Sequence, residues 1–86
     1  MTRLFQPAIP IAVESDARGR PQQFYWQERL HRVARIEQSW EIDTDWWTPA
    51  ERAARTYFAV TTQAGLLCVV YHDRLGGAWY LSSAYD

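Results

Sequence analysis

Lysine and asparagine are absent from this sequence of 86 residues, and cysteine occurs once. The single cysteine, Cys68, permits no internal disulfide, so the core must be stable without covalent cross-links. Cys68 lies in an apolar segment, which favours a small buried side chain over a reactive thiol. All nine basic residues are arginine. Because arginine stacks on aromatic rings in ways that lysine cannot, we expect such stacking in a chain with five tryptophans.

Long hydrophobic runs are also missing. The longest apolar stretch, residues 65–71, is far shorter than the roughly 20 residues that a membrane-spanning helix needs. Near the N-terminus, Pro7 and Pro10 interrupt the chain before an apolar region of signal-peptide length can form. The sequence therefore predicts no membrane segment and no signal peptide, and we expect a cytoplasmic protein.

The residues that are present describe a small folded domain. Hydrophobic residues make up 48% of the chain, the net charge is −1, and five Trp, five Tyr and three Phe supply aromatic surface. A chain of this length can form only one core, so we expect a single domain spanning residues 1–86.

Hydrophobic periodicity predicts an all-β fold. Segments rich in β-branched and aromatic residues alternate with turn residues; they are residues 9–14, 22–26, 28–42, 56–62, 66–72 and 78–85. The short connections favour a small antiparallel meander of five to six strands, curled into a barrel that protects its edges. We expect Trp40, Phe58, Tyr71 and Trp79 in its core.

Two segments are ambiguous in this pattern. Residues 28–42 also fit a helical stripe, but their neighbours favour a strand, and a bulge near Ala34–Gln38 would reconcile the spacing of Val33, Ile36 and Trp40. Thr48-Pro49-Ala50-Glu51 has the residues of a capping box. It predicts at most one short helix near residues 49–55.

Charge is segregated along the chain. Residues 17–36 contain five Arg and one Glu, whereas residues 37–51 contain five acidic residues and no base. The two segments either pair across a hairpin or form a binding face. On the second interpretation, arginines and aromatic rings combine into one surface, with Trp46-Trp47 as a second patch because adjacent strand residues point to opposite faces. The candidate binding residues are Tyr25, Trp26, Arg29, His31, Arg32, Arg35, Trp46 and Trp47.

Motifs for catalysis or metal binding are weak. Glu41, Asp43 and Asp45 alternate on one strand face but lack the glycine and distal glutamate of a calcium loop. His31, or His72 with the adjacent Asp73, would be the acid-base candidates. We expect no catalytic residues, no cofactor and no metal.

The order of the aromatic residues resembles that of a family of uncharacterised bacterial domains. The residues that carry the resemblance are Phe24-x-Trp26-x-x-Arg29-x-His31-x-Val33, Trp40, Trp46-Trp47, Arg55-x-Tyr57-Phe58-x-Val60, Gly65-Leu66, Trp79-Tyr80-Leu81 and Tyr85-Asp86. Members of that family stand alone or form the C-terminal tail of Y-family-polymerase-like proteins of the bacterial mutasome. The resemblance implies a module beside DNA-damage-tolerance proteins and brings no catalytic residues.

We therefore expect a non-catalytic module that binds another protein, as an accessory to DNA repair or translesion synthesis. The alternative is a weak single-stranded nucleic-acid binder that uses the arginine and aromatic face. The net negative charge of the chain disfavours nucleic-acid binding, because non-specific affinity for nucleic acid comes mainly from neutralising phosphates. We expect no membrane partner, and either a monomer or a homodimer formed through strand edges.

Overall fold

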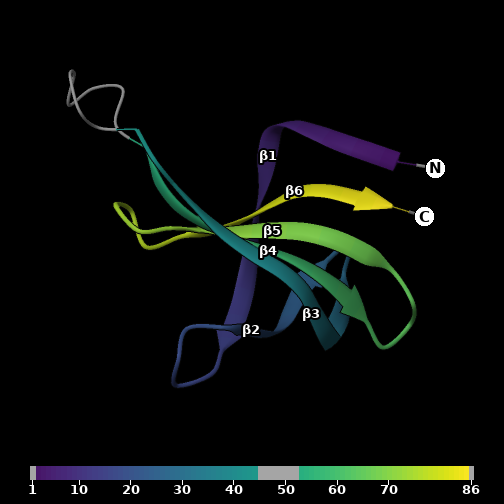
Figure 1. Ribbon diagram of the computed structural model, residues 1–86. Helices are drawn as coiled ribbons and strands as arrows, with labels where there is room; N and C mark the ends of the chain where they lie inside the picture. The colour runs from purple at the N-terminus through teal and green to yellow at the C-terminus, as the bar shows by residue number, and fades with distance from the viewer. Residues whose placement is uncertain (1, 45–52, 86) are drawn as a thin grey trace.

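Six antiparallel strands close into a ring in the order β1-β2-β3-β4-β5-β6 (Figure 1). The structure is a computed structural model, and it describes residues 2–44 and 53–85. The strands are β1 (Thr2–Ser15), β2 (Pro21–Trp26), β3 (Arg29–Asp43), β4 (Ala54–Thr62), β5 (Leu67–Asp73) and β6 (Trp79–Tyr85). The predicted all-β meander, curled into a barrel, is confirmed.

The described residues contain no helix, and so none that could cross a membrane. Of the short helix expected near residues 49–55, residues 49–52 lie outside the described part of the chain. The remainder is extended: Ala54 and Arg55 begin β4 and pair with Asp43 and Ile42 of β3. Pairing with β3 therefore overrides the helical propensity of this alanine- and arginine-containing stretch.

The core is formed by the inward faces of β2, β4, β5 and β6. It consists of Phe24, Trp26, Phe58, Val60, Cys68, Val70, Leu81 and Ala84. Cys68 is fully buried, as predicted, and Trp79 is half-buried against the core. Tyr71 is buried, as predicted, whereas Trp40 is only half-buried and is a correction to the expected core. Both lie on the opposite face of the sheet, because each is opposite Tyr57, whose neighbour Phe58 points inward.

The long strand β3 contains the irregularity that its sequence predicts. Its register with β4 shifts between Val33 and Arg35 and again between Ile36 and Gln38. These shifts keep Val33 and Ile36 against the core, although their spacing breaks the alternation of a regular strand.

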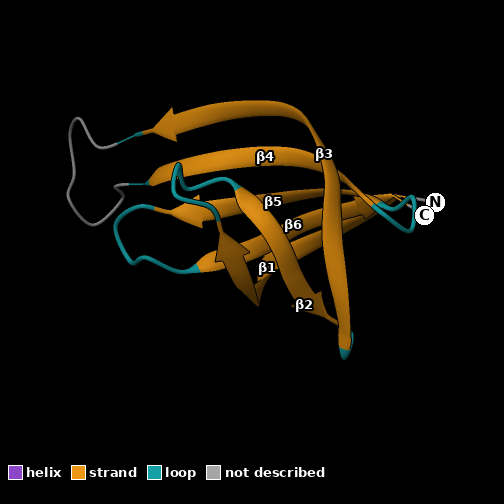
Figure 2. Ribbon diagram, turned by 90° about the horizontal axis from the view of Figure 1, so that it is seen from below, coloured by secondary structure: helices purple, strands orange, loops and turns teal. Residues whose placement is uncertain are grey.

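Strand β2 is short, so it closes the barrel along only part of β1 and β3. It pairs with residues 12–15 of β1 and with residues 29–32 of β3. The first part of β1 therefore pairs only with β6, and β3 beyond Arg32 pairs only with β4, within the described residues. Figure 2 shows the short β2 beside the much longer β3. Pro7 and Pro10 lie in the one-sided part of β1, where proline is tolerated because it has no backbone N–H to donate to a second neighbouring strand.

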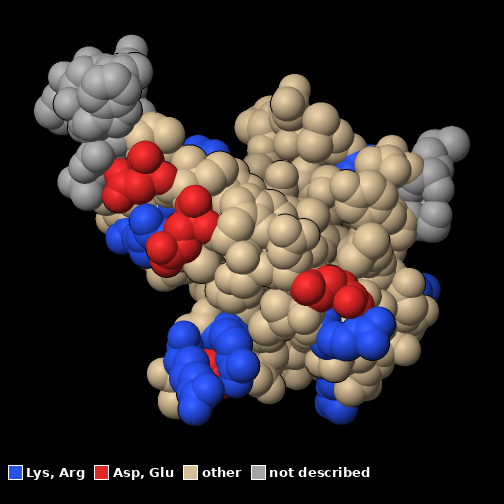
Figure 3. All heavy atoms as spheres, viewed as in Figure 1, with Lys and Arg blue, Asp and Glu red and all other residues tan. Residues whose placement is uncertain are grey.

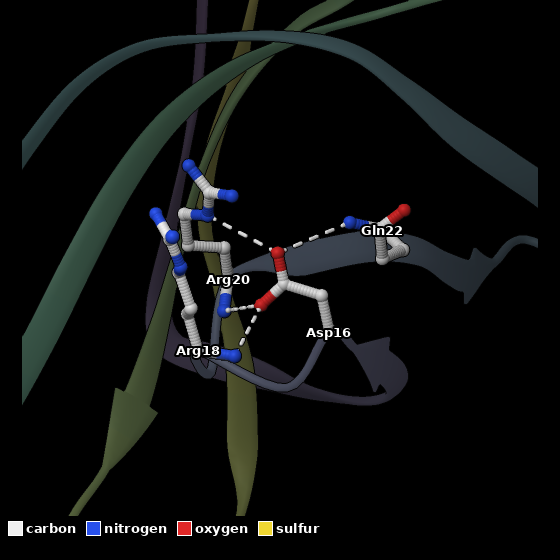
Figure 4. Close-up of polar contacts among 4 residues, drawn as sticks. All are labelled: Asp16, Arg18, Arg20 and Gln22. Atoms are coloured by element: carbon white, nitrogen blue, oxygen red, sulfur yellow. Dashed lines mark hydrogen bonds and ion pairs between the residues drawn. The ribbon is translucent and has the colours of Figure 1, made fainter.

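Asp16 organises the turn between β1 and β2 (Figure 4). Its Oδ1 accepts the backbone N–H groups of Arg18 and Arg20, both at 2.9 Å, and its Oδ2 accepts Arg20 Nε at 3.1 Å. The Arg20 backbone hydrogen bond is the main reason that the pKa of Asp16 lies below its ordinary value. The ionised carboxylate therefore stabilises the folded state.

We predict that Asp16→Asn lowers the midpoint of chemical denaturation near neutral pH, because the amide cannot accept all of these hydrogen bonds. The pKa of Asp16 is lowered by folding, so its contribution is complete above the unfolded pKa and is lost as pH falls through the folded pKa. The difference between wild type and variant should thus shrink in acid. Glu28→Gln, an exposed change, is the control. A difference that stays constant down to strongly acidic pH would contradict this role.

The turn between β2 and β3 has a left-handed backbone at both of its central residues. Gln27 and Glu28 adopt φ of 53° and 61° between the paired residues Trp26 and Arg29. Two consecutive positive φ values are typical of a type I′ hairpin, where Asn-Gly is favoured. We predict that replacing Gln27-Glu28 with Asn-Gly raises the free energy of unfolding by about 1 kcal/mol, because left-handed backbone costs other residues about that much. Replacement with Ala-Ala should give no gain; an equal gain would show that the turn geometry is not the cause.

Candidate interaction surface

The outer face of the barrel carries one large aromatic residue from each of four neighbouring strands. Trp40 lies opposite Tyr57, Tyr57 opposite Tyr71, and Tyr71 opposite Tyr80. The ring centroids are separated by 5.3, 4.9 and 5.1 Å along this series, and the Trp40 and Tyr57 planes are nearly parallel. We call these four residues the aromatic row.

Alternation within the strands places the row outside. In β4, β5 and β6, each tyrosine of the row is adjacent to Phe58, Val70 or Leu81, and these three side chains point into the core. Adjacent strand residues face opposite sides of a sheet, so the tyrosines must face outward. Tyr71 is buried although it faces outward, because it lies between the rings of Tyr57 and Tyr80.

Arg55 lies over the middle of the aromatic row. Its Cζ is 4.7 Å from the Tyr71 ring centroid, and its Nη1 donates a hydrogen bond of 3.3 Å to Tyr57 Oη. That hydrogen bond raises the pKa of Arg55 above its ordinary value. Burial raises the pKa of the Tyr71 phenol, which the nearby guanidinium partly opposes. Arginine stacking, expected from composition, is thus present on a tyrosine.

An open groove of about 360 Å³ borders the row. One side is the segment Leu4–Ala8, where the register of β1 with β6 is interrupted, and the other side is formed by Arg55, Tyr57, Tyr71 and Ser82. Leu4 is 66% exposed. The groove combines apolar and aromatic side chains with the polar groups of Gln6, Ser82 and Arg55, which suits an apolar side chain that carries a polar or acidic neighbour.

In the view of Figure 3, charged side chains lie around an uncharged central area over β4, β5 and β6. Arg35 Nε pairs with Glu37 Oε2 at 2.9 Å, and the same carboxylate oxygen accepts the Thr61 hydroxyl at 2.7 Å. Together the Thr61 hydroxyl and Arg35 lower the pKa of Glu37. The charges of Arg35 and Glu37 are therefore paired with each other, and the Glu37 carboxylate is also hydrogen-bonded by Thr61.

Arg74, in the turn after β5, neutralises part of the acidic segment. It lies 3.6 Å from Glu41 and 3.9 Å from Asp43, and its Nη1 donates to Thr56 Oγ1 at 2.9 Å. Glu41 and Asp43 share a strand face opposite Trp40 and Ile42, as their alternation predicts. The Arg35–Glu37 ion pair joins the basic and acidic segments. Within residues 2–44 and 53–85, no other ion pair joins the two segments.

The sequence-predicted arginine and aromatic face does not form a single surface. Tyr25 is 51% exposed, but Trp26 is only 9% exposed and belongs to the core. His31 is half-buried beside it: its ring lies 5.2 Å from Phe24, and its Nε2 donates to the Trp26 carbonyl at 3.1 Å. Arg29, Arg32 and Arg35 are exposed on β3. Trp46 and Trp47 lie outside the described residues.

The histidines have structural contacts. His72 packs against Trp79 with ring centroids 4.9 Å apart, and His31 contacts Phe24 and Trp26. Across residues 2–44 and 53–85, neither imidazole forms a hydrogen bond or ion pair with a carboxylate, and no cluster of three or more metal-ligating side chains occurs.

The aromatic row was not among the sequence-predicted site residues, although a signal for it exists. Tyr57-Phe58, Val70-Tyr71 and Tyr80-Leu81 each place two large residues side by side in a strand. Only one member of each pair can enter the core. The alternation that predicts opposite directions for Trp46 and Trp47 therefore also predicts three of the four residues of the row.

A family model described as a domain of unknown function (DUF6504) matches residues 1–86. The chain belongs to this family. Searches of curated proteins and of solved structures give no match. The surface of this DUF6504 member carries the features that bear on what it binds.

The buried phenol of Tyr71 gives a prediction for alkaline pH. Its pKa is raised by folding, so its contribution to stability is complete below the unfolded pKa and is lost as pH rises through the folded value. We predict that the denaturation midpoint of wild type falls more steeply above about pH 10 than that of Tyr71→Phe, since tyrosine ionises there. Tyr25→Phe, at an exposed site, should behave as wild type. Identical alkaline profiles for wild type and Tyr71→Phe would contradict the burial argument.

Proposed function

We propose that the domain is a non-catalytic protein-binding module whose contact surface is the aromatic row and the adjoining groove. The observation that supports it is the presence of four large aromatic rings outside a barrel whose core is already filled by other residues. Tyrosine, tryptophan and arginine are the residues that most often dominate binding energy in protein interfaces. The row and Arg55 bring all three types together on one face, and Arg55, Tyr57 and Tyr71 also line the groove.

Single-stranded nucleic acid is the less favoured ligand for this surface. Bases bind by stacking on free ring faces, with nearby cations following the phosphates. In the row, the faces of Tyr57 and Tyr71 are occupied by neighbouring rings. Arg55, the cation over the row, is also engaged with Tyr57 and Tyr71, and Arg35 of β3 is paired with Glu37. Such a surface offers apolar area and ring edges, which suit a protein.

The class of partner follows from the resemblance of the aromatic order to mutasome-associated domains. On this proposal the module acts in the bacterial cytoplasm and binds a protein of DNA repair or translesion synthesis. Its own residues would supply contact area, while the chemistry would belong to the partner.

The test compares surface variants in affinity capture from cells of the source organism, with and without DNA damage. Tyr80→Ser and Trp40→Ser should remain folded by circular dichroism and lose the captured protein. Once that protein is purified, its affinity should fall by about 2 kcal/mol, as expected for an interface hot spot. Tyr25→Ser, on the outside of β2, is the matched control and should retain capture.

Two results would overturn the proposal. One is equal capture and affinity for wild type and both folded row variants. The other is a captured fraction that disappears on nuclease treatment, together with tryptophan quenching by oligonucleotide that salt reverses, which would favour the nucleic-acid alternative.

A further inference from the structure

The second half of β3 has an edge that the barrel leaves unpaired. Residues Gln38–Asp43 pair with residues 54–59 of β4, while the partner on the other side, β2, ends its pairing at Arg32. Among the described residues, no strand pairs with that side of Gln38–Asp43. In Figure 2 this part of β3 forms the margin of the sheet, with β4 on one side only. Unpaired strand edges present rows of N–H and C=O groups that can template another strand.

This edge differs from the other parts of the ring that are paired on one side. The one-sided part of β1 contains Pro7 and Pro10, which have no N–H to donate. The first one-sided residues of β3 carry two register shifts between Val33 and Gln38, and such bulges disrupt a template. From Gln38 to Asp43, in contrast, the register with β4 is unbroken. Six regular residues are a typical strand length.

Trp40 makes the outer side of this edge apolar. Tyr57 covers one face of its indole at 5.3 Å, and within residues 2–44 and 53–85 no ring contacts the other face. Ile42, on the same side of the sheet, is 37% exposed. A strand added at the edge would place its own side chain beside Trp40, where an aromatic ring would continue the aromatic row by one position.

The opposite side of the same edge is acidic. Glu41 and Asp43 are both exposed, and Arg74 is the one described cation that pairs with them. Two carboxylates facing one guanidinium leave an excess negative charge. A strand added here is therefore favoured if its residues on this side are Lys or Arg.

We propose that residues Gln38–Asp43 bind an extended segment of the partner protein by strand addition, with an aromatic residue beside Trp40 and basic residues beside Glu41 and Asp43. This mode rests on the proposed function, since it extends the same surface. Backbone hydrogen bonds would supply affinity, and the alternating side chains would supply specificity. A second copy of the chain fits less well, because its own β3 would bring two more carboxylates to this acidic edge.

The probe is a capped peptide that alternates basic and apolar residues, Lys-Val-Lys-Phe-Lys-Val-Lys, added to the 86-residue chain. Amide chemical shifts of Gln38–Asp43 should change and their hydrogen exchange should slow. A peptide with N-methylated backbone at alternate residues should not bind, nor should one with Glu in place of Lys. Glu41→Gln combined with Asp43→Asn should weaken binding by at least about tenfold, whereas Glu28→Gln should leave it unchanged.

Several outcomes would overturn strand addition. They are equal binding of the N-methylated peptide, shift changes that map elsewhere, and a homodimer in sedimentation whose β3 edge is protected without peptide. The native partner separates this inference from the proposed function. If capture is lost in Tyr80→Ser but unchanged in the Glu41→Gln, Asp43→Asn variant, the interaction surface stands and strand addition is wrong.

Discussion

The inward packing of Phe58, Val70 and Leu81 is the constraint on which the rest of the surface depends. These three residues are opposite one another on β4, β5 and β6 and are almost completely excluded from solvent. A strand cannot direct two adjacent side chains to one face. The core of this small barrel therefore determines that a line of tyrosines lies outside, and Trp40 extends that line across β3.

The short strand β2 imposes a second constraint. It closes the ring at one end and leaves long parts of β1 and β3 paired on one side. These one-sided parts differ in regularity. Prolines interrupt β1 and bulges interrupt the start of the one-sided part of β3, whereas the end of β3 is regular. The aromatic row ends at that regular edge, so the two features form one continuous surface.

Much of the architecture was predictable from local pattern. The presence of six strands, the barrel and the bulge near Ala34 follow from alternation and turn residues, which are local properties. The extension of β1 over residues 2–8 was not predicted. The direction of Trp40 and the burial of Trp26 were not predictable, because each depends on the strand opposite it. The tight turn at Gln27-Glu28 was also missed, since neither residue favours the positive φ that both adopt. The predicted binding face was divided for the same reason: strand pairing, not proximity in sequence, decides which side chains share a surface.

The central claim is that the aromatic row contacts a protein partner. The most direct measurement is hydroxyl-radical footprinting by mass spectrometry, comparing the free domain with its complex with the captured partner. The account predicts that Trp40, Tyr57 and Tyr80 become protected while Tyr25 remains as reactive as before. Protection of Tyr25 and its neighbours on β2, with the aromatic row unchanged, would contradict it.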